Sequence, residues 1–298
     1  MNILIIGGHG FVGSQLLRDL RENIPSAKIY ISTSRRQVIG DNIEFVDYSN
    51  YTAVKRLLAR SKPQYIIHLA TSCMSNSGDD SLVKGQLRDS NIIDALVELE
   101  MKSRLIFVAS MAVFGVKNQN ITPKIYSPMS NYGLEKLYMI NRLEELAIKN
   151  IKFSFKIVYP SSIYGKGQKG KMFLPRLFEY IQSGELMEAY GGNKKRDFVH
   201  VKDVSSALVK LMLKYEKYLD KYIFMHSFNF YKISEIANIV CEITGLNPEE
   251  TIVFHDSKYA LIKDDLESQI VAEDYRLHPE LMAKISIFDG LNDMFKMN

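Results

Sequence analysis

The first half of the chain alternates short apolar runs with stretches in which apolar residues recur at helical spacing. Short continuous apolar runs are typical of buried strands in a parallel sheet. We therefore expect strands at Asn2–Ile6, Lys28–Ile31, Glu44–Val46, Gln64–Leu69, Arg104–Ala109 and Phe153–Val158. The stretches between them predict helices at Phe11–Arg21, Thr52–Arg60, Leu87–Leu99 and Tyr132–Ile148. This alternation predicts an α/β fold, a doubly wound parallel sheet with helices on both faces.

The pattern changes after residue 164, where a loop rich in glycine and lysine occupies Gly165–Lys171. Beyond it we expect helices at Phe173–Gln182, Val204–Leu213 and Ile233–Thr244, with short strands between them. We interpret residues 1–164 as the domain of the large sheet and residues 165–298 mainly as a smaller C-terminal cap. Residues 196–214 are expected to return to the large domain.

The composition is that of an ordinary globular protein. Of the 298 residues, 46% are hydrophobic and 24% are charged, so global disorder is not expected. No stretch approaches the roughly 20 uninterrupted apolar residues that a membrane helix needs. The segment Met1–Gly7 has no basic leader and enters a strand-like run at once. We therefore expect neither a signal peptide nor a membrane partner.

Charge and cysteine content narrow the class further. Cys73 and Cys241 are the two cysteines, too few for a disulfide framework, which favours a reducing, cytoplasmic location. The 6 histidines are scattered without metal-ligand spacing, so no metal site is expected. A net charge of +4 suits an anionic small molecule and is too small to predict a nucleic-acid partner.

A glycine-rich turn joins the first expected strand to the first expected helix. Gly7, Gly10 and Gly13 fall within it, and Phe11 and Val12 open the helix. Glycine suits a tight turn that must approach a pyrophosphate closely, and a helix N-terminus offers unpaired N–H groups to phosphate. His9 takes the place of the middle glycine of the usual dinucleotide fingerprint. The turn predicts a dinucleotide site of the Rossmann type at these five residues.

The end of the second strand bears on which dinucleotide is bound. An acidic residue there commonly bonds the ribose 2′-hydroxyl of NAD. Here the strand runs into Ser34, Arg35 and Arg36 instead, and guanidinium groups match the geometry of a 2′-phosphate. We predict NADP(H) as the preferred cofactor, with NAD(H) as the alternative. Arg35 and Arg36 could equally form a solvated loop face.

Three residues form a candidate catalytic set. Tyr132 and Lys136 are four residues apart, which places both on one face of a helix. A nearby ammonium favours the phenolate, so the tyrosine can exchange a proton near neutral pH. Ser110 ends the fifth strand, and open α/β sheets hold their ligands at the carboxyl ends of strands. Its hydroxyl could orient a carbonyl or carbinol oxygen beside Tyr132.

Together these motifs resemble an extended short-chain dehydrogenase/reductase of the NAD-dependent epimerase/dehydratase family. The resemblance covers most of the chain and implies that Lys136 also bonds the nicotinamide ribose and that Arg196 holds a substrate diphosphate. The segments that carry it are the glycine turn, Asp47, the fourth-strand motif His68–Leu69–Ala70, Ser110–Gly115, Tyr132 with Lys136, and Lys195–Asp203. By the same resemblance, Asp47 contacts adenine, Leu69 and Ala70 line the cofactor, and the cap binds substrate.

The chain also departs from the family pattern in two places. Met111 and Ala112 stand where the 4,6-dehydratases carry an Asp-Glu pair, which argues against dehydratase chemistry. In the segment Tyr159–Gly165, Tyr159 replaces an arginine, and Ser162 replaces an asparagine that usually helps to bind the substrate phosphates. We expect Ser162 to bind substrate together with Ser110 and Arg196.

The resemblance implies a nucleoside-diphosphate sugar as the substrate and a homodimer as the assembly. The preferred hypothesis is an NADP(H)-dependent reductase of a nucleoside-diphosphate-linked 4-keto-6-deoxyhexose. A sugar-nucleotide 4-epimerase that recycles tightly held NAD is the alternative within the family. A non-catalytic, NADP-sensing regulatory protein is the alternative of another class, and the set of Ser110, Tyr132 and Lys136 argues against it.

Overall fold

A computed structural model describes residues 1–34, 43–72, 78–115, 126–149, 151–255 and 277–296 of the chain. Strands and helices alternate through the first half as their apolar runs predict. These elements are β1 (Asn2–Ile6), α1 (Phe11–Asn23), β2 (Lys28–Thr33), β3 (Ile43–Phe45), α2 (Tyr51–Ser61), β4 (Tyr65–His68), α3 (Asp79–Glu98), β5 (Arg104–Val108), the 3-10 turn η1 (Met111–Val113), α4 (Asn131–Ala147) and β6 (Ser154–Pro160).

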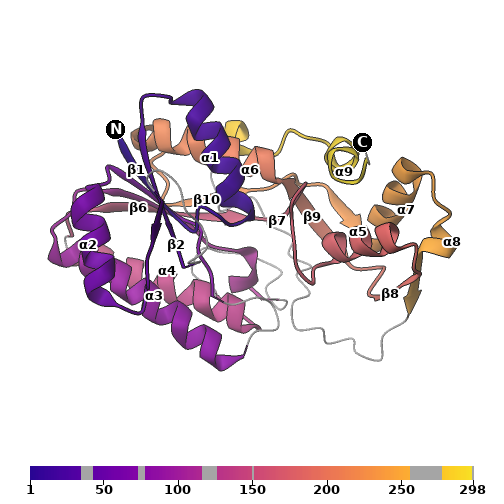
Figure 1. Ribbon diagram of the computed structural model, residues 1–298, viewed down its shortest axis with the longest axis horizontal. Coiled ribbons are helices and arrows are strands. Elements are labelled where there is room, and N and C mark those ends of the chain that lie inside the picture. The colour runs from indigo at the N-terminus through magenta and orange to yellow at the C-terminus, as the bar shows by residue number, and fades with distance from the viewer. Residues whose placement is uncertain (35–42, 73–77, 116–125, 150, 256–276, 297–298) are drawn as a thin grey trace.

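The second half contributes shorter elements. They are β7 (Ser162–Tyr164), α5 (Phe173–Ser183), β8 (Met187–Tyr190), β9 (Lys195–His200), α6 (Val201–Leu213), η2 (Tyr215–Lys217), β10 (Tyr222–Met225), β11 (Phe230–Lys232), α7 (Ile233–Thr244), α8 (Pro248–Thr251), β12 (Ile252–His255), η4 (Pro279–Leu281) and α9 (Ile287–Phe295). Most of them gather beside the large sheet, at the right of Figure 1.

A seven-stranded sheet forms the centre of the molecule, with the strand order β10-β6-β5-β4-β1-β2-β3. Each neighbouring pair in it is parallel. The order reverses direction between β1 and β4, and open sheets of this kind bind ligands at the carboxyl ends of the strands beside such a point. The predicted fold class, an α/β Rossmann-type doubly wound sheet, is confirmed.

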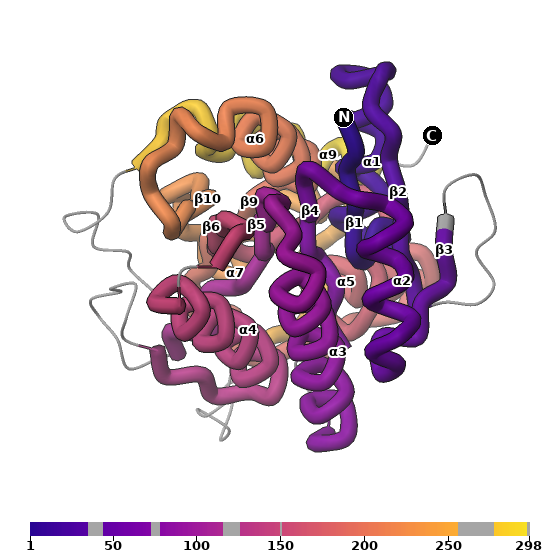
Figure 2. The backbone as a smooth tube through the Cα atoms, turned by 90° about the vertical axis from the view of Figure 1, so that its left-hand side faces the viewer, coloured from indigo at the N-terminus to yellow at the C-terminus, as the bar shows by residue number. Residues whose placement is uncertain are grey.

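Helices cover both faces of this sheet (Figure 2). Helices α2, α3 and α4 bury one face in a core that contains Leu4 and Ile6. Helices α1 and α6 bury the other in a core that contains Ile3 and Ile5. Alternate residues of β1 therefore enter different cores, and a strand covered on both faces is apolar throughout.

The smaller part of the molecule has a third core, formed largely by α5, α7, α9 and strands β8 and β12. Beside it lies a three-stranded sheet in the order β11-β9-β7. Helix α6 and strand β10 come from the second half of the sequence and yet pack on the large sheet. The division into a domain of residues 1–164 and a cap stays a prediction.

Helix α3 differs most from its sequence-based expectation. It begins at Asp79 rather than at Leu87. Its first two turns hold Leu82 and Val83 among polar residues, an apolar pattern too short for periodicity to predict a helix there. Asp79 and Asp80 in the first turn suit the positive end of the helix dipole, a start signal that the periodicity did not weigh. No helix among the described residues has the length and apolar content to cross a bilayer.

Candidate active site

The glycine turn after β1 depends on the absence of side chains at two positions. Gly7 has a φ of +86°, and its N–H donates to Ser32 O over 3.1 Å. A Cβ on Gly7 would lie 2.9 Å from the nitrogen of Ala70, and one on Gly13 would lie 2.6 Å from Gly7 O. Because both glycines lack side chains, the start of α1 can lie directly against the turn, and Ala70 after β4 can lie beside it.

The N-terminus of α1 is open to an anion. Gly10 is its N-cap residue, no side chain caps it, and its first turn, which begins with Phe11 and Val12, carries no acidic residue. Unpaired N–H groups and the positive end of the helix dipole are the features that hold phosphate in dinucleotide sites. The residues present therefore fit the pyrophosphate of a nicotinamide dinucleotide.

The residues expected near the adenosine half lie around the ends of β2 and β3. Ser34 follows β2 and is exposed, while Arg35 and Arg36 lie outside the described residues. Asp47 follows β3, is exposed, and accepts hydrogen bonds from the Ser49 amide and hydroxyl at 3.0 and 2.6 Å. Asp47 is thus held in a tight turn ahead of α2.

Ser110, Tyr132 and Lys136 come together from β5 and α4. Ser110 follows β5 and caps η1, and its hydroxyl is close enough to Tyr132 to lower the pKa of the phenol. The Nζ of Lys136 donates to Val108 O at 3.1 Å and to Ala70 O at 3.3 Å. It lies 5.9 Å from the centre of the Tyr132 ring. Lys136 therefore ties the ends of β4 and β5 to the helix that carries the tyrosine.

Burial raises the pKa of Tyr132 above its ordinary value, although the hydrogen bond with Ser110 acts in the opposite direction and the Glu135 charge adds to the rise. The surroundings of Tyr132 therefore raise its pKa, contrary to the lowering expected from Lys136, and the phenol is protonated at neutral pH. A protonated phenol next to a serine hydroxyl can donate a proton to an oxygen that the serine holds. The arrangement suits proton donation to a developing alkoxide.

Ser162 and Arg196 line one small pocket, together with Met111 of η1. Since Met111 directly follows Ser110, the pocket adjoins the candidate catalytic set. Tyr159, at the position of the family arginine, is fully buried, and its hydroxyl meets that of Tyr126 at 2.9 Å.

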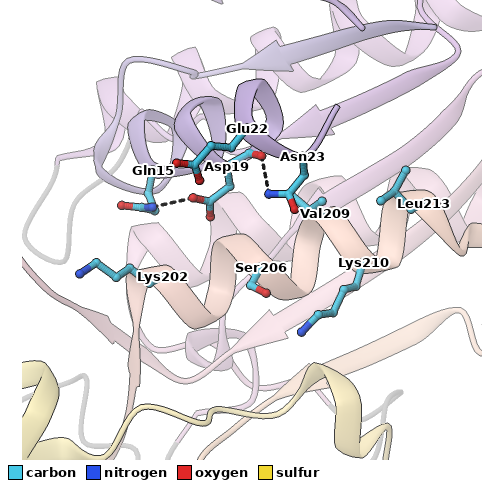
Figure 3. A pocket seen from close by; sticks show the side chains of 9 residues that line it. All are labelled: Gln15, Asp19, Glu22, Asn23, Lys202, Ser206, Val209, Lys210 and Leu213. Carbon is cyan, nitrogen blue, oxygen red and sulfur yellow. Dashed lines mark hydrogen bonds between the residues drawn. The ribbon is translucent and has the colours of Figure 1, made fainter. Parts of the chain in front are cut away.

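A larger groove between α1 and α6 is lined by charged and polar side chains such as Asp19 and Lys202 (Figure 3). This groove is larger than the pocket beside Arg196. None of the residues predicted for the site lines this groove. Its size therefore does not make it the candidate site.

A comparison with protein-family models supplies the deciding observation, because residues 3–224 match the model described as the NAD dependent epimerase/dehydratase family. The chain belongs to this family. Several of its relatives are named as sugar-nucleotide epimerases or dehydrogenases, and the glycine turn lies within the matched residues.

Individual members of the epimerase/dehydratase family are distant from this chain. It is 24% identical over 297 residues to a GDP-6-deoxy-D-talose 4-dehydrogenase of Aggregatibacter actinomycetemcomitans, covering 93% of each chain. It is 28% identical to a putative UDP-glucose 4-epimerase of Methanocaldococcus jannaschii, covering 69% of this chain and 71% of the relative. The fold matches a crystal structure of UDP-glucuronic acid 4-epimerase from Bacillus cereus with a TM-score of 0.81, at 19% identity over 99% and 98% of the two chains.

Sequence reasoning missed a buried ionic cluster beneath the site. Arg88 Nε donates to Asp89 Oδ1 at 2.8 Å, and its terminal nitrogen donates to Glu135 Oε1 at 2.7 Å. The Nε2 of His68 bonds Asp89 Oδ1 at 2.9 Å. All four side chains are buried. The cluster therefore links the end of β4 to α3 and to the residue before Lys136.

Glycine in α3 makes this cluster sterically feasible. A Cβ on Gly85 would lie 2.4 Å from the carboxyl carbon of Glu135. Glu135 also accepts hydrogen bonds from the Thr71 hydroxyl at 3.0 Å and the Ser72 amide at 2.9 Å. A helix-period analysis places Arg88 and Asp89 on the inner face of α3, and that mismatch of charge and burial was the available signal.

Proposed function

We propose that the protein is an NADP(H)-dependent reductase that converts a nucleoside-diphosphate-linked 4-keto-6-deoxyhexose to the 4-hydroxy sugar. The observation that carries the proposal is the neighbouring pair of Ser110 and protonated Tyr132, beside a pocket that contains Arg196. The relative named GDP-6-deoxy-D-talose 4-dehydrogenase supports it, because the reverse of such a dehydrogenation reduces a 4-keto-6-deoxyhexose. Residues 1–164 would bind the cofactor and the cap would bind the sugar nucleotide.

The residues of the set have different tasks in this proposal. The glycine turn and Lys136 would hold the coenzyme, which when bound would supply a hydride for the carbonyl carbon. Ser110 donates a hydrogen bond to the carbonyl oxygen and orients it, and Tyr132 gives that oxygen its proton as the alkoxide develops. Lys136 holds Tyr132 in place and bonds the nicotinamide ribose. Arg196 and Ser162 hold the diphosphate at the other end of the substrate.

The preference for NADP(H) rests on the residues after β2. The described part of this segment ends with Ser32, Thr33 and Ser34, so no carboxylate follows the strand there to select the 2′-hydroxyl of NAD. Arg35 and Arg36 come next in the sequence and would pair with a 2′-phosphate.

Coenzyme consumption tests the reductase directly. Purified protein is offered a panel of nucleoside-diphosphate 4-keto-6-deoxyhexoses with NADPH, and with NADH in parallel. We expect stoichiometric loss of NADPH with one member of the panel and slower loss of NADH. Loss of NADH alone would contradict the cofactor assignment, and no loss of either would contradict the reductase.

Replacing the proton donor separates chemistry from binding. We expect Tyr132→Phe to lower kcat at least 100-fold, because general acid catalysis typically contributes about that much or more. NADPH affinity, measured by fluorescence titration, should change little. Tyr138→Phe is the matched control: Tyr138 lies on the same helix, and its hydroxyl bonds Ser90 at 2.6 Å. Comparable kcat values in the two variants would exclude the assigned role.

A 4-epimerase is the second candidate, because relatives named as UDP-glucose 4-epimerases also match this chain. An epimerase regenerates its coenzyme within each cycle and consumes none. Tightly bound NAD in the purified protein, together with interconversion of 4-epimers without net coenzyme loss, would favour it over the reductase.

A further inference from the structure

A second polar cluster lies at the pocket that contains Arg196, formed by side chains that the proposed chemistry does not use. The Ser161 hydroxyl donates to Asp197 Oδ2 at 2.7 Å, and His226 Nδ1 lies 2.9 Å from the same oxygen. Ser161 Oγ also contacts His226 Nδ1. Asp197, His226 and Ser161 all line the pocket together with Ser162 and Arg196.

These contacts fix where the imidazole carries its proton. Burial alone would raise the pKa of Asp197, but hydrogen bonds from His226, Ser227 and Ser161 hold it below its ordinary value. Asp197 is therefore a carboxylate and needs donors, so the proton of a neutral His226 is on Nδ1 and Nε2 is an acceptor. Ser161, His226 and Asp197 do not form the catalytic triad of a serine hydrolase. In such a triad the serine and the aspartate contact opposite nitrogens of the histidine ring, whereas here both contact Nδ1.

The other edge of the ring has no partner. His226 is 2% exposed, and its Nε2 has no hydrogen-bond partner among the described residues. A buried polar atom without a partner costs free energy, and such atoms in native structures call for an explanation. Among polar side chains at this pocket, the imidazole thus offers a free acceptor.

The backbone next to His226 is strained. Phe228 has a φ of +60°, a conformation that non-glycine residues rarely adopt, and its ring stacks on the imidazole with centroids 5.5 Å apart. On the same strand end, Phe224 stacks on the imidazole with centroids 5.9 Å apart. Strain of this kind persists where surrounding contacts over-determine it, and it clusters at ligand sites. The aromatic contacts and Asp197 together hold the imidazole in one orientation.

The position of the pocket indicates which part of a substrate would meet the ring. Met111, next to Ser110, and Arg196 both line the pocket. A sugar nucleotide whose reacting carbon is at Ser110 and whose diphosphate is at Arg196 would present its sugar ring between them. Sugar hydroxyls donate hydrogen bonds, whereas phosphate oxygens only accept them at neutral pH.

We propose that His226 is a specificity-determining residue, whose Nε2 accepts a hydrogen bond from a hydroxyl group of the bound sugar. Asp197 and Ser161 act through it as positioning residues that keep Nδ1 protonated and Nε2 free to accept. The inference rests on the proposed function, since it takes a sugar nucleotide as the occupant of the pocket. It adds the residue that distinguishes the sugar from a bare nucleoside diphosphate.

The test compares binding of a nucleoside diphosphate with binding of its sugar conjugate, measured by calorimetry on the full chain with NADP⁺ present. Two probe pairs are used, UDP with UDP-glucose and GDP with GDP-mannose. We expect His226→Phe to weaken the sugar conjugate of the preferred pair about tenfold, the typical effect of leaving a buried hydrogen-bonding group unpaired. The affinity for the diphosphate alone should not change. His226→Gln, which can place an oxygen near the Nε2 position, should recover part of the loss.

Other results would overturn the proposal. Equal weakening of the diphosphate and the sugar conjugate would make His226 a phosphate contact, and unchanged affinities would make it structural. If the wild type binds neither pair and reduces no sugar of the panel, the proposed function itself fails. If it reduces a sugar and His226→Phe still binds normally, only the present inference fails.

A measurement on the wild type does not rest on comparing affinities between variants. Long-range ¹H–¹⁵N spectra report the tautomer of each histidine, and the His226 signals are assigned by their loss in His226→Gln. We expect a neutral ring protonated at Nδ1, whose Nε2 resonance moves when the sugar conjugate binds and not when the diphosphate binds. A ring protonated at Nε2 in the complex would contradict the assignment.

Discussion

Two buried clusters centred on carboxylates lie close to the candidate site, and they balance their charge differently. Beneath the cofactor turn, Asp89 and Glu135 share the guanidinium of Arg88. Beside the substrate pocket, Asp197 is held by hydroxyl, amide and imidazole donors. Buried paired charges hold the packed elements in place, because removing either member leaves the other buried and uncompensated. In the second cluster, hydroxyl, amide and ring N–H groups surround the single carboxylate and leave one imidazole edge available to a ligand.

Removing the shared cation should have the largest effect on stability. In Arg88→Met the two carboxylates remain buried without their partner, so we expect the free energy of unfolding to fall by about 3–5 kcal/mol. Equilibrium unfolding in urea, followed by circular dichroism, measures the change. Arg88→Lys keeps the charge without the planar fork that reaches both acids, and it should fall between the wild type and Arg88→Met.

Lys152→Met is the matched control, since Lys152 pairs with Glu100 on the surface. An exposed ion pair contributes little, so this variant should unfold at nearly the wild-type urea concentration. If both variants lost similar unfolding free energy, burial would not be what makes the Arg88 ion pairs important for stability.

The second cluster should be easier to perturb. Ser161→Ala removes one of several donors to Asp197, and we expect it to cost about 1.5 kcal/mol of unfolding free energy, the lower end for a hydrogen bond to a charged group. The remaining donors, His226 and Ser227, keep the carboxylate partly satisfied. A loss as large as that of Arg88→Met would show that the two clusters do not differ in kind.

The two clusters also show which features of the molecule could not be predicted from the sequence. Periodicity predicted six of the seven strands of the large sheet within about two residues, because a strand buried on both faces is apolar throughout. The seventh, β10, was expected only as one of several short strands without assigned bounds. The glycine turn and the pair Tyr132 and Lys136 were predicted from local spacing. Their burial and contacts could not be, since these depend on chain segments distant in sequence.

Residues of the two clusters illustrate that limit. Arg88 and Glu135 are 47 positions apart and meet only because α3 and α4 pack side by side on the sheet. His226 and Asp197 are 29 positions apart, and they meet where β10 ends beside β9. Asp197 was within a recognised motif, but its partner His226 had no local pattern around it. Pairs made by packing become visible only in three dimensions.

The smallest expected effect is that of pH on the free energy of unfolding. It tests the first cluster alone, through His68. Burial is the main cause that lowers the pKa of His68, although its hydrogen bond to Asp89 opposes the shift. The Ala70 amide donates to Nδ1 at 3.3 Å, which leaves the single proton of the neutral ring on Nε2, facing Asp89. The unfolded chain takes up a proton at His68 below about pH 6.5, while the folded chain stays neutral to a lower pH. The stability that His68 contributes is therefore fully present above that pH and falls as the pH drops towards the folded pKa, by at most about 1.4 kcal/mol per pH unit.

We expect urea unfolding at pH 7.5, 6.5 and 5.5 to show this slope, and His68→Gln to reduce it. A slope that is the same in His68→Gln would mean that another group, such as the buried His200, whose pKa burial also lowers, dominates the acid sensitivity.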